Sequence, residues 1–483
     1  MKRVIMRKFL CILLIVVLVC LAVCCFTACN AKTDETAIII LPGLLASGLY
    51  DGETGEPVWD PLTSNEIFMD MFVNHGSMDL SAIDDTTVND ALRIVKAIID
   101  NDPKSMTSLM AMDSNGVPLY PSVVPAGEGF DNPSRLYYGA LGNCKQLFDA
   151  LKNRYGDVCQ VKMFNYDWRI SNETNAKLLE NFINSKGYKN VYIVSHSMGG
   201  HLASCYMARS KSNLEKVKGF VSLDTPFYGA LTALSNIEDR EGMIDGLIDT
   251  LYNMNVSLVD TYLKNMLGVK SSNRDAIYEK FRTVCKNRFM PMFNFDTLIE
   301  LLPSKQLLDT PQYTMTWDYL NTSKKTSFIK INGEYLTDQN EIIKFYKSRD
   351  WAYQVNADGS KGELRDAITR LENYWTKMDV SLKIDALYVN GLGYGTQDTV
   401  CYNAPLDSGG NPIYSEAVMT GTESQRQGDG TVLLYSATLG LHTDAENVLL
   451  ISNADHFDPA IQFDYFSSKS VFKWLDKRLF KLQ

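Results

Sequence analysis

The chain has 483 residues, of which 45% are hydrophobic and 22% are charged, and its formal net charge at pH 7 is −10. These values are typical of a globular protein and exclude a disordered or fibrous chain. The excess of acidic residues also argues against a nucleic-acid partner, because such partners require a basic surface. We expect one elaborated domain over residues 37–483 rather than two or three smaller ones.

The N-terminus has the pattern of an export signal, in which four basic residues precede an apolar run over residues 9–26. Phe26-Thr27-Ala28-Cys29 follows and resembles the lipobox of bacterial lipoproteins, where small residues precede a lipidated cysteine. We therefore expect a signal peptide over residues 1–28, lipidation of Cys29 and a tether over residues 29–36. An uncleaved anchor is the alternative, because the apolar run is barely long enough to span a bilayer. Both place the body outside the cytoplasm, and lipidation would anchor it to the outer face of the bacterial cytoplasmic membrane.

Short apolar runs rich in β-branched residues and bounded by turn residues are typical of buried parallel strands. Six such runs occur, at residues 37–41, 159–164, 191–195, 219–222, 386–390 and 448–452. Helical patterns stand between or after them, at residues 143–155, 172–186, 200–210 and 465–480. This alternation predicts an α/β fold with a doubly wound, mostly parallel sheet that helices cover on both faces.

Two long stretches, at about residues 46–135 and 230–385, interrupt this alternation and are predicted to be insertions that form a cap or lid. Both are poor in strand signal and contain apolar clusters, at residues 67–72, at residues 289–295 and around Trp317. Such clusters form either an interfacial surface or the small cores of the insertions themselves, and both alternatives stay open here.

The segment Ser195-His196-Ser197-Met198-Gly199-Gly200 stands between an apolar strand and a helix. This is the context of a nucleophile elbow, in which a strained turn exposes a serine Oγ above the strand ends of an α/β-hydrolase. Small residues must flank the serine because strand and helix nearly touch there. The pattern departs from G-x-S-x-G at Ser195, but serine is also small. We predict Ser197 to be the nucleophile.

A serine nucleophile needs an imidazole base, and the chain has only five histidines, His75, His196, His201, His442 and His456. The second and third lie on the elbow and its helix, where geometry directs them away from Oγ. His75 precedes most of the strands and His442 precedes the last one. Only His456 follows the end of the final strand, where an α/β-hydrolase carries its histidine, so we predict it to be the base.

Three aspartates, Asp224, Asp398 and Asp429, follow strands and could orient the histidine. Asp429 is favoured because Gly428-Asp429-Gly430 permits a tight turn and lies between the run at residues 386–390, the seventh strand in α/β-hydrolase numbering, and the histidine loop. Asp224 follows the run at residues 219–222, the sixth strand in that numbering, which carries the acid in some hydrolases. It remains an alternative together with Asp398.

Acyl transfer also requires two donors that stabilise the oxyanion, and these are usually backbone amides. Met198, directly after the nucleophile, supplies one. The loop after the first strand supplies the other, from Leu44 or Leu45, with Leu44 taken as the donor and Gly43 allowing the sharp exit from the strand. This chemistry needs no cofactor.

The five cysteines after the N-terminal segment are widely spaced and contain no CxxC pair. They indicate neither a disulfide framework nor a zinc site, so buried free thiols and no metal are expected.

Five islands together resemble the lecithin:cholesterol acyltransferase family, which includes lysosomal phospholipases. They are residues 39–43, Tyr166-Asp167-Trp168-Arg169, residues 195–200, Asp224-Thr225-Pro226 and residues 428–432. The resemblance implies serine acyl-enzyme chemistry on glycerophospholipids without a metal, with water or an alcohol as acceptor. It also implies Ser197, Asp429 and His456 as nucleophile, acid and base. Ser195, the divergent insertions and the lack of matching disulfides depart from the family.

The expected function is that of a serine lipid acyl hydrolase or O-acyltransferase. Its partners would be a lipid or acyl-ester substrate and, through the lipid anchor, a membrane surface. A triacylglycerol lipase or carboxylesterase is the alternative, since residues 455–458 resemble bacterial lipases around their histidine. A lipoprotein that keeps the fold but binds a ligand without turnover is a third possibility.

Overall fold

The computed structural model describes residues 33–59, 96, 99–126, 144–253, 267, 274–309, 313–314, 321–322 and 327–480. The predicted signal peptide, Cys29 and the start of the predicted tether lie outside these ranges. So do His75, Trp317 and the apolar cluster at residues 67–72. Among the helices within the ranges, none combines the length and the hydropathy that crossing a membrane requires.

A six-stranded parallel sheet forms the centre of the molecule, in the order β17-β14-β7-β6-β1-β5. Its strands are β1 (Thr33–Leu41), β5 (Cys159–Met163), β6 (Asn190–His196), β7 (Val217–Leu223), β14 (Ala386–Leu392) and β17 (Val448–Ser452). Five of them contain a predicted run whole, and β5 ends one residue before the end of its run at residues 159–164. Because β5 and β6 lie on opposite sides of β1, the strand order reverses there, and ligands bind at such switch points in open α/β sheets.

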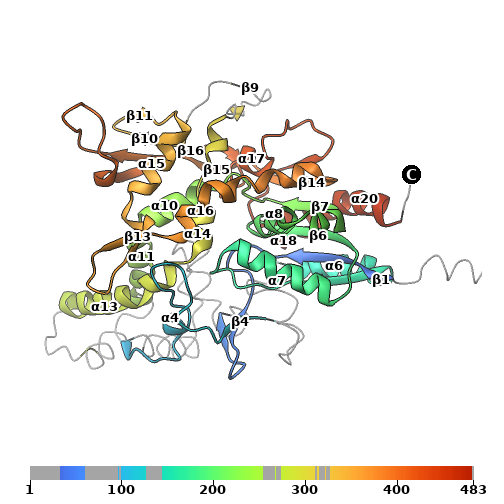
Figure 1. Ribbon diagram of the computed structural model, residues 1–483, viewed down its shortest axis with the longest axis horizontal. Helices are drawn as coiled ribbons and strands as arrows, with labels where there is room; N and C mark the ends of the chain where they lie inside the picture. The colour runs from blue at the N-terminus through green and yellow to red at the C-terminus, as the bar shows by residue number, and fades with distance from the viewer. Residues whose placement is uncertain are drawn as a thin grey trace, which may run out of the picture.

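Helices cover both faces of this sheet (Figure 1). Alternate residues of β1 divide between the faces, as the period of a strand requires. Ile38 and Ile40 pack with α6 (Lys145–Tyr155) and α20 (Ser468–Leu479), whereas Ile39 packs on the other side. There it meets the buried residues of α7 (Asn172–Ser185) and α8 (Gly199–Arg209). The doubly wound sheet predicted from the sequence is therefore confirmed.

The segment predicted to be the second insertion, named the cap region, is mainly helical and lies to the left of the sheet in Figure 1. Its helices are α10 (Leu231–Glu238), α11 (Arg240–Asn253), α13 (Arg274–Phe289), α14 (Asp296–Glu300), α15 (Gln339–Ser348) and α16 (Asp366–Trp375). Short strands β12 (Tyr353–Val355) and β13 (Lys361–Leu364) form a hairpin within it.

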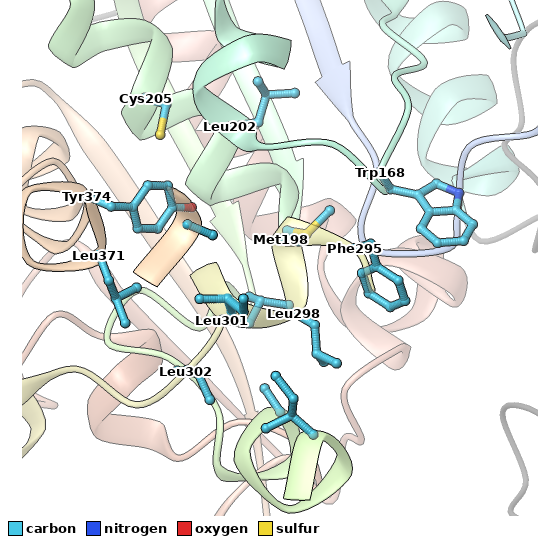
Figure 2. Packing of buried hydrophobic residues seen from close by; sticks show 14 of the residues in the cluster. Trp168, Met198, Leu202, Cys205, Phe295, Leu298, Leu301, Leu302, Leu371 and Tyr374 are labelled. Carbon is cyan, nitrogen blue, oxygen red and sulfur yellow. The ribbon is translucent and has the colours of Figure 1, made fainter. Parts of the chain in front are cut away.

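The apolar cluster at residues 289–295 belongs to the core, since Phe289, Met292, Phe293 and Phe295 are all buried. Figure 2 draws Phe295, Leu298 and Leu301 around Met198, which directly precedes α8, with Leu202 farther up on that helix. All of these residues belong to one hydrophobic cluster. The cap region therefore packs directly behind the elbow. The apolar residues at 289–295 are part of this packing and do not form an interfacial surface.

A long antiparallel hairpin follows β14 and was not predicted. It consists of β15 (Tyr394–Asn403) and β16 (Val418–Gly428) and joins β10 (Ile329–Ile331) and β11 (Glu334–Tyr335) in a four-stranded sheet. From the first predicted insertion, β2 (Leu49–Asp51), β3 (Pro57–Trp59) and β4 (Val123–Pro125) form a separate three-stranded sheet, with the short α4 (Met106–Leu109) nearby.

Cys144, Cys205, Cys285 and Cys401 are free thiols, as expected, and the buried cysteines are Cys144, Cys159, Cys205 and Cys285. Cys401 on β15 is partly exposed, contrary to the expectation, because its Sγ lies 3.6 Å from Glu423 Oε1 at an exposed position of the four-stranded sheet.

Candidate active site

Ser197 occupies the sharp turn between β6 and α8, with a φ of 51° that non-glycine residues rarely adopt. The strand and helix leave no room for larger neighbours. A Cβ on Gly199 would clash with the carbonyl oxygen of Leu41, and Ser195 fits the first glycine position with its side chain fully buried. The elbow predicted from the sequence therefore has the local geometry that exposes a serine above the sheet.

Three predicted site residues from separate elements meet in one hydrogen-bonded chain. Ser197 Oγ lies 2.9 Å from Nε2 of His456, and Nδ1 of His456 lies 2.8 Å from Oδ2 of Asp429. His456 and Asp429 are only 5% and 2% exposed, so water competes little for these bonds. This arrangement allows the imidazole to accept the serine proton while the carboxylate holds the ring.

The glycine-rich turn after β16 explains the position of Asp429. Its Oδ1 accepts hydrogen bonds from the amides of Thr431 and Val432, at 2.8 and 2.6 Å. Its backbone carbonyl also accepts a hydrogen bond from the His456 amide at 3.0 Å. Amide donors favour the ionised carboxylate, and both the side chain and the backbone of Asp429 hold the histidine loop.

Within the described ranges, no other histidine forms a hydrogen bond to Ser197 Oγ. His196 Nε2 lies 2.9 Å from the carbonyl oxygen of His456, and burial lowers the pKa of His196 to about 3. His201 lies between Tyr374 Oη and the carbonyl of Pro226, and burial lowers its pKa to about 4. His442 is exposed beside Asp444.

The alternative acids occupy different surroundings. Asp224 is completely buried near Asp429 but, in the described structure, forms no hydrogen bond to His456. Asp398 is buried on β15, where burial raises its pKa to about 6, and its carboxylate oxygens have no hydrogen-bond partner among the described residues. Among the three candidates within the described ranges, only Asp429 contacts the imidazole.

Asp224, Asp429 and His456 also form the one group in the described part of the chain whose ligand atoms are close enough to hold a metal ion. Both ring nitrogens of His456 already face protein partners, Asp429 and Ser197. A metal would have to displace one of them, so the group fits an acid–base array better than a metal site.

The loop after β1 passes directly beside the nucleophile. A Cβ on Gly43 would lie 3.0 Å from Cβ of Ser197, so only glycine fits without displacement. The Ala46 amide donates to the Gly43 carbonyl at 3.3 Å, which closes a turn in which Leu45 has a φ of 63°. Leu44 lies in this turn, and Met198 precedes α8 at the positive end of the helix dipole. Their roles as oxyanion donors stay predictions.

Tyr166 and Trp168 hold this loop, a task that the sequence analysis did not assign to them. Tyr166 Oη donates to the Pro42 carbonyl at 2.7 Å, and Trp168 Nε1 donates to the Ser47 carbonyl at 3.2 Å. Between them Asp167 forms a buried ion pair at 2.8 Å with Arg169. The Tyr-Asp-Trp-Arg island was the available signal, but a motif alone does not reveal which backbone it contacts.

The family model of lecithin:cholesterol acyltransferase matches residues 145–447, which include Ser197 and Asp429 and end before His456. Two Arabidopsis thaliana proteins are similar over 57% of this chain. Lecithin-cholesterol acyltransferase-like 4 is 23% identical over 292 residues, and phospholipase A(1) LCAT3 is 25% identical over 291 residues. These matches cover 48% and 57% of the two proteins, so the chain spans about half the length of the curated relatives it matches.

Solved structures are more distant. The structure of the Tle4–Tli4 complex has a TM-score of 0.47 and 13% identity, covering 93% of this chain and 99% of that chain. E-2-(Acetamidomethylene)succinate hydrolase has a TM-score of 0.27 and 12% identity, covering 68% and 86%. Likenesses at these TM-scores carry no inference about activity.

Proposed function

The chain belongs to the lecithin:cholesterol acyltransferase family, and from this premise we propose that it is a serine acyl hydrolase or O-acyltransferase of lipid esters. The observation that carries the proposal is the hydrogen-bonded chain from Ser197 through His456 to Asp429, with the serine in a strained elbow.

In the first step His456 Nε2 takes the Ser197 proton while Oγ forms a bond to the ester carbonyl carbon. The amides of Met198 and Leu44 stabilise the oxyanion that develops on the carbonyl oxygen. The carbon–oxygen bond to the leaving alcohol then breaks, and His456 returns the proton to that alcohol. Asp429 stays ionised and keeps the imidazole in the tautomer that has its proton on Nδ1.

In the second step water or an alcohol attacks the acyl-serine, again with His456 as the base. Water releases a fatty acid, and an alcohol releases a new ester. No metal or cofactor enters either step. The balance between hydrolysis and transfer depends on which acceptor reaches the acyl-enzyme.

Glycerophospholipids are the proposed substrate class, supported by the family and by the name of one relative, a phospholipase A(1). A triacylglycerol lipase or carboxylesterase would use the same three residues. Substrate comparison is therefore part of the test.

The first experiment labels the full-length chain, purified in detergent, with a fluorophosphonate probe. The wild type is expected to react, and Ser197→Ala is expected to lose the label. Ser204→Ala is the matched control, because this buried serine on α8 has no hydrogen-bond partner in the described structure and its loss should leave labelling intact. A folded wild type that is not labelled would contradict the enzyme hypothesis and favour a ligand-binding lipoprotein.

The second experiment offers three substrates to unlabelled wild-type protein from the same preparation: phosphatidylcholine vesicles, a triacylglycerol emulsion and a short-chain nitrophenyl ester. Fatty acid release from the vesicles supports the phospholipase assignment. Activity confined to the other two would favour a lipase or carboxylesterase. Adding a long-chain alcohol to the vesicles and measuring its ester separates transfer from hydrolysis.

Export and lipid anchoring through Cys29 are proposed on the sequence alone, from the basic residues, the apolar run and the lipobox-like segment. In a bacterial host, the wild type should partition into the membrane fraction and incorporate labelled palmitate. Cys29→Ser should lose the palmitate label. Palmitate-free wild-type protein that stays in the membrane would favour the uncleaved anchor instead.

A further inference from the structure

Asp224 is a second buried acid beside the proposed machinery, and the mechanism above gives it no task. It directly follows β7, its side chain has no exposed surface, and its φ is 52°. A non-glycine residue in this conformation costs free energy, and such strain is concentrated at functional sites. The position therefore calls for an account of what the carboxyl group does.

The neighbouring strand β14 forms hydrogen bonds to the backbone amide and to one carboxyl oxygen of Asp224. Its amide donates to the Val389 carbonyl at 3.0 Å, and the Gly391 amide donates to Oδ1 at 2.7 Å. Oδ2 is buried and has no hydrogen-bond partner in the described part of the structure. One side-chain oxygen of Asp224, one of Asp429 and one ring nitrogen of His456 all lie within 4.8 Å of one another. Since Oδ1 is bound to Gly391, Oδ2 is the atom available to interact with Asp429.

Two carboxylates in such a buried site do not both stay ionised, because their repulsion is not screened by water. Burial and the charge of Asp429 raise the pKa of Asp224 well above its usual range, and Asp455 acts in the same direction. Asp429 is the better anion, since two amides and the His456 ring donate to it. His196, a further titratable group beside His456, is neutral and donates to a backbone carbonyl.

We propose that Asp224 is a positioning residue: a neutral carboxylic acid that directs its Oδ2 proton at the Asp429 carboxylate. The inference rests on the function proposed above. No bond to Asp224 forms or breaks during the reaction, and its proton stays on the pair of carboxyl groups. The hydrogen bond holds Asp429 against His456 and reduces the negative charge that faces the imidazole, so the base is held in place without being made too basic.

The test measures kcat and KM against pH for the full-length chain in detergent, with p-nitrophenyl butyrate as substrate. Asp224→Asn is neutral, offers an N–H to Asp429 and tolerates a positive φ. It should stay within about tenfold of the wild-type kcat and keep the acid limb of the profile.

Asp224→Gly fits the backbone but has no donor. It should lower kcat about tenfold or more with KM unchanged, and should move the acid limb to higher pH. Asp429→Asn, which changes the acid that contacts His456 directly, should lower kcat roughly 10⁴-fold.

A purely structural role for Asp224 would not move the acid limb in the glycine variant. An acid limb that moves to lower pH in Asp224→Asn would overturn the proposal, because it would mean that the wild-type residue is ionised. So would a wild-type rate and profile in Asp224→Gly. If the glycine variant does not fold, the profile of the asparagine variant still decides.

A second measurement does not depend on activity. The infrared difference spectrum of wild type minus Asp224→Asn at pH 7 should contain the carbonyl band of one protonated carboxyl group. Its absence overturns the proposal even in an active enzyme. Its presence in a protein that fluorophosphonate does not label would instead place the failure in the proposed function.

Discussion

The Nε2 atom of His196 lies 2.9 Å from the backbone carbonyl oxygen of His456, so the residue before the proposed nucleophile also anchors the loop of the proposed base. Burial and the adjacent His456 lower the pKa of His196 to about 3, which keeps the ring neutral. Its one proton then belongs on Nε2, where it can donate to that carbonyl. The elbow and the histidine loop, 260 residues apart in the chain, are thereby linked directly.

Replacing this histidine with a residue of similar size should loosen the histidine loop. His196→Phe removes the donor and leaves the His456 carbonyl without that partner, so kcat should fall about tenfold, the effect of one buried hydrogen bond. KM and the acid limb of the pH–rate profile should not change, because the lost ring is neutral. His442→Phe, at an exposed histidine, is the control and should retain wild-type kcat. A shifted acid limb in His196→Phe would mean that His196 itself takes part in proton transfer.

The contact between Tyr166 and the Pro42 carbonyl predicts a second effect on turnover. Tyr166→Phe removes the 2.7 Å hydrogen bond that fixes the loop beside Ser197, so kcat should fall about tenfold while fluorophosphonate still reacts. Tyr346→Phe is chemically matched, because Tyr346 Oη donates to the carbonyl of Pro303 at 2.9 Å in the cap region. Tyr346→Phe should lower the melting temperature about as much as Tyr166→Phe does, but it should leave kcat unchanged. Equal kcat in the two variants would mean that the loop does not depend on Tyr166.

Because the elbow is closely packed, we expect that adding even a methyl group at Gly199 lowers the stability of the protein. In Gly199→Ala the new Cβ meets the Leu41 carbonyl, which is backbone at the end of β1 and cannot rotate away. We expect unfolding to become easier by about 1–3 kcal/mol, as is typical of overpacking, together with loss of probe labelling. Gly246→Ala in α11 is the control, since a Cβ built there meets no atom of the described residues within 4 Å and alanine favours helix. A Gly199→Ala variant as stable as Gly246→Ala would contradict the described elbow.

The central sheet could be predicted because its strands are buried on both faces and so appear as continuous apolar runs. Each of the six runs became a strand. The hairpin of β15 and β16 could not be predicted in this way. Its buried side chains include Thr396, Asp398 and Thr399, which a hydrophobicity pattern assigns to solvent. Their burial depends on the cap region and on the other strands of the hairpin sheet, which are distant in the sequence.

The chain order of Ser197, Asp429 and His456 identified the three residues that the structure brings together. Order could not reveal the surrounding contacts. Tyr166 meets Pro42 across 124 residues, and Asp224 meets Gly391 across 167. Both contacts exist because distant strands become neighbours in the sheet. Treating Asp224 and Asp429 as alternatives also obscured that the fold places both near the same histidine.

Behind the elbow, the buried Glu300 of α14 ends a polar network that includes Asn172, Tyr374 and His201. The amide and the side chain of Asn172 donate to Glu300 Oε2 at 2.8 and 2.9 Å, and Asn172 Nδ2 also lies 3.2 Å from Tyr374 Oη, which meets His201. Burial raises the pKa of Glu300 to about 8. Near neutral pH, Glu300 is therefore protonated in the folded protein, whereas it is ionised in the unfolded chain.

This difference sets the sign of a pH dependence. Between the unfolded pKa of about 4.3 and the folded value, the folded state binds more protons than the unfolded state, so this group lowers the free energy of unfolding as pH rises. Glu300→Gln carries no such proton. The free energy of unfolding of the variant minus that of the wild type, from urea titrations between pH 5 and pH 9, should increase with pH up to about 8 and then level off. The difference isolates Glu300 from other buried groups such as Asp398 and His201. A constant difference would mean that Glu300 is ionised in the folded protein, and that Arg370, whose guanidinium lies 3.9 Å from Oε1, compensates its burial.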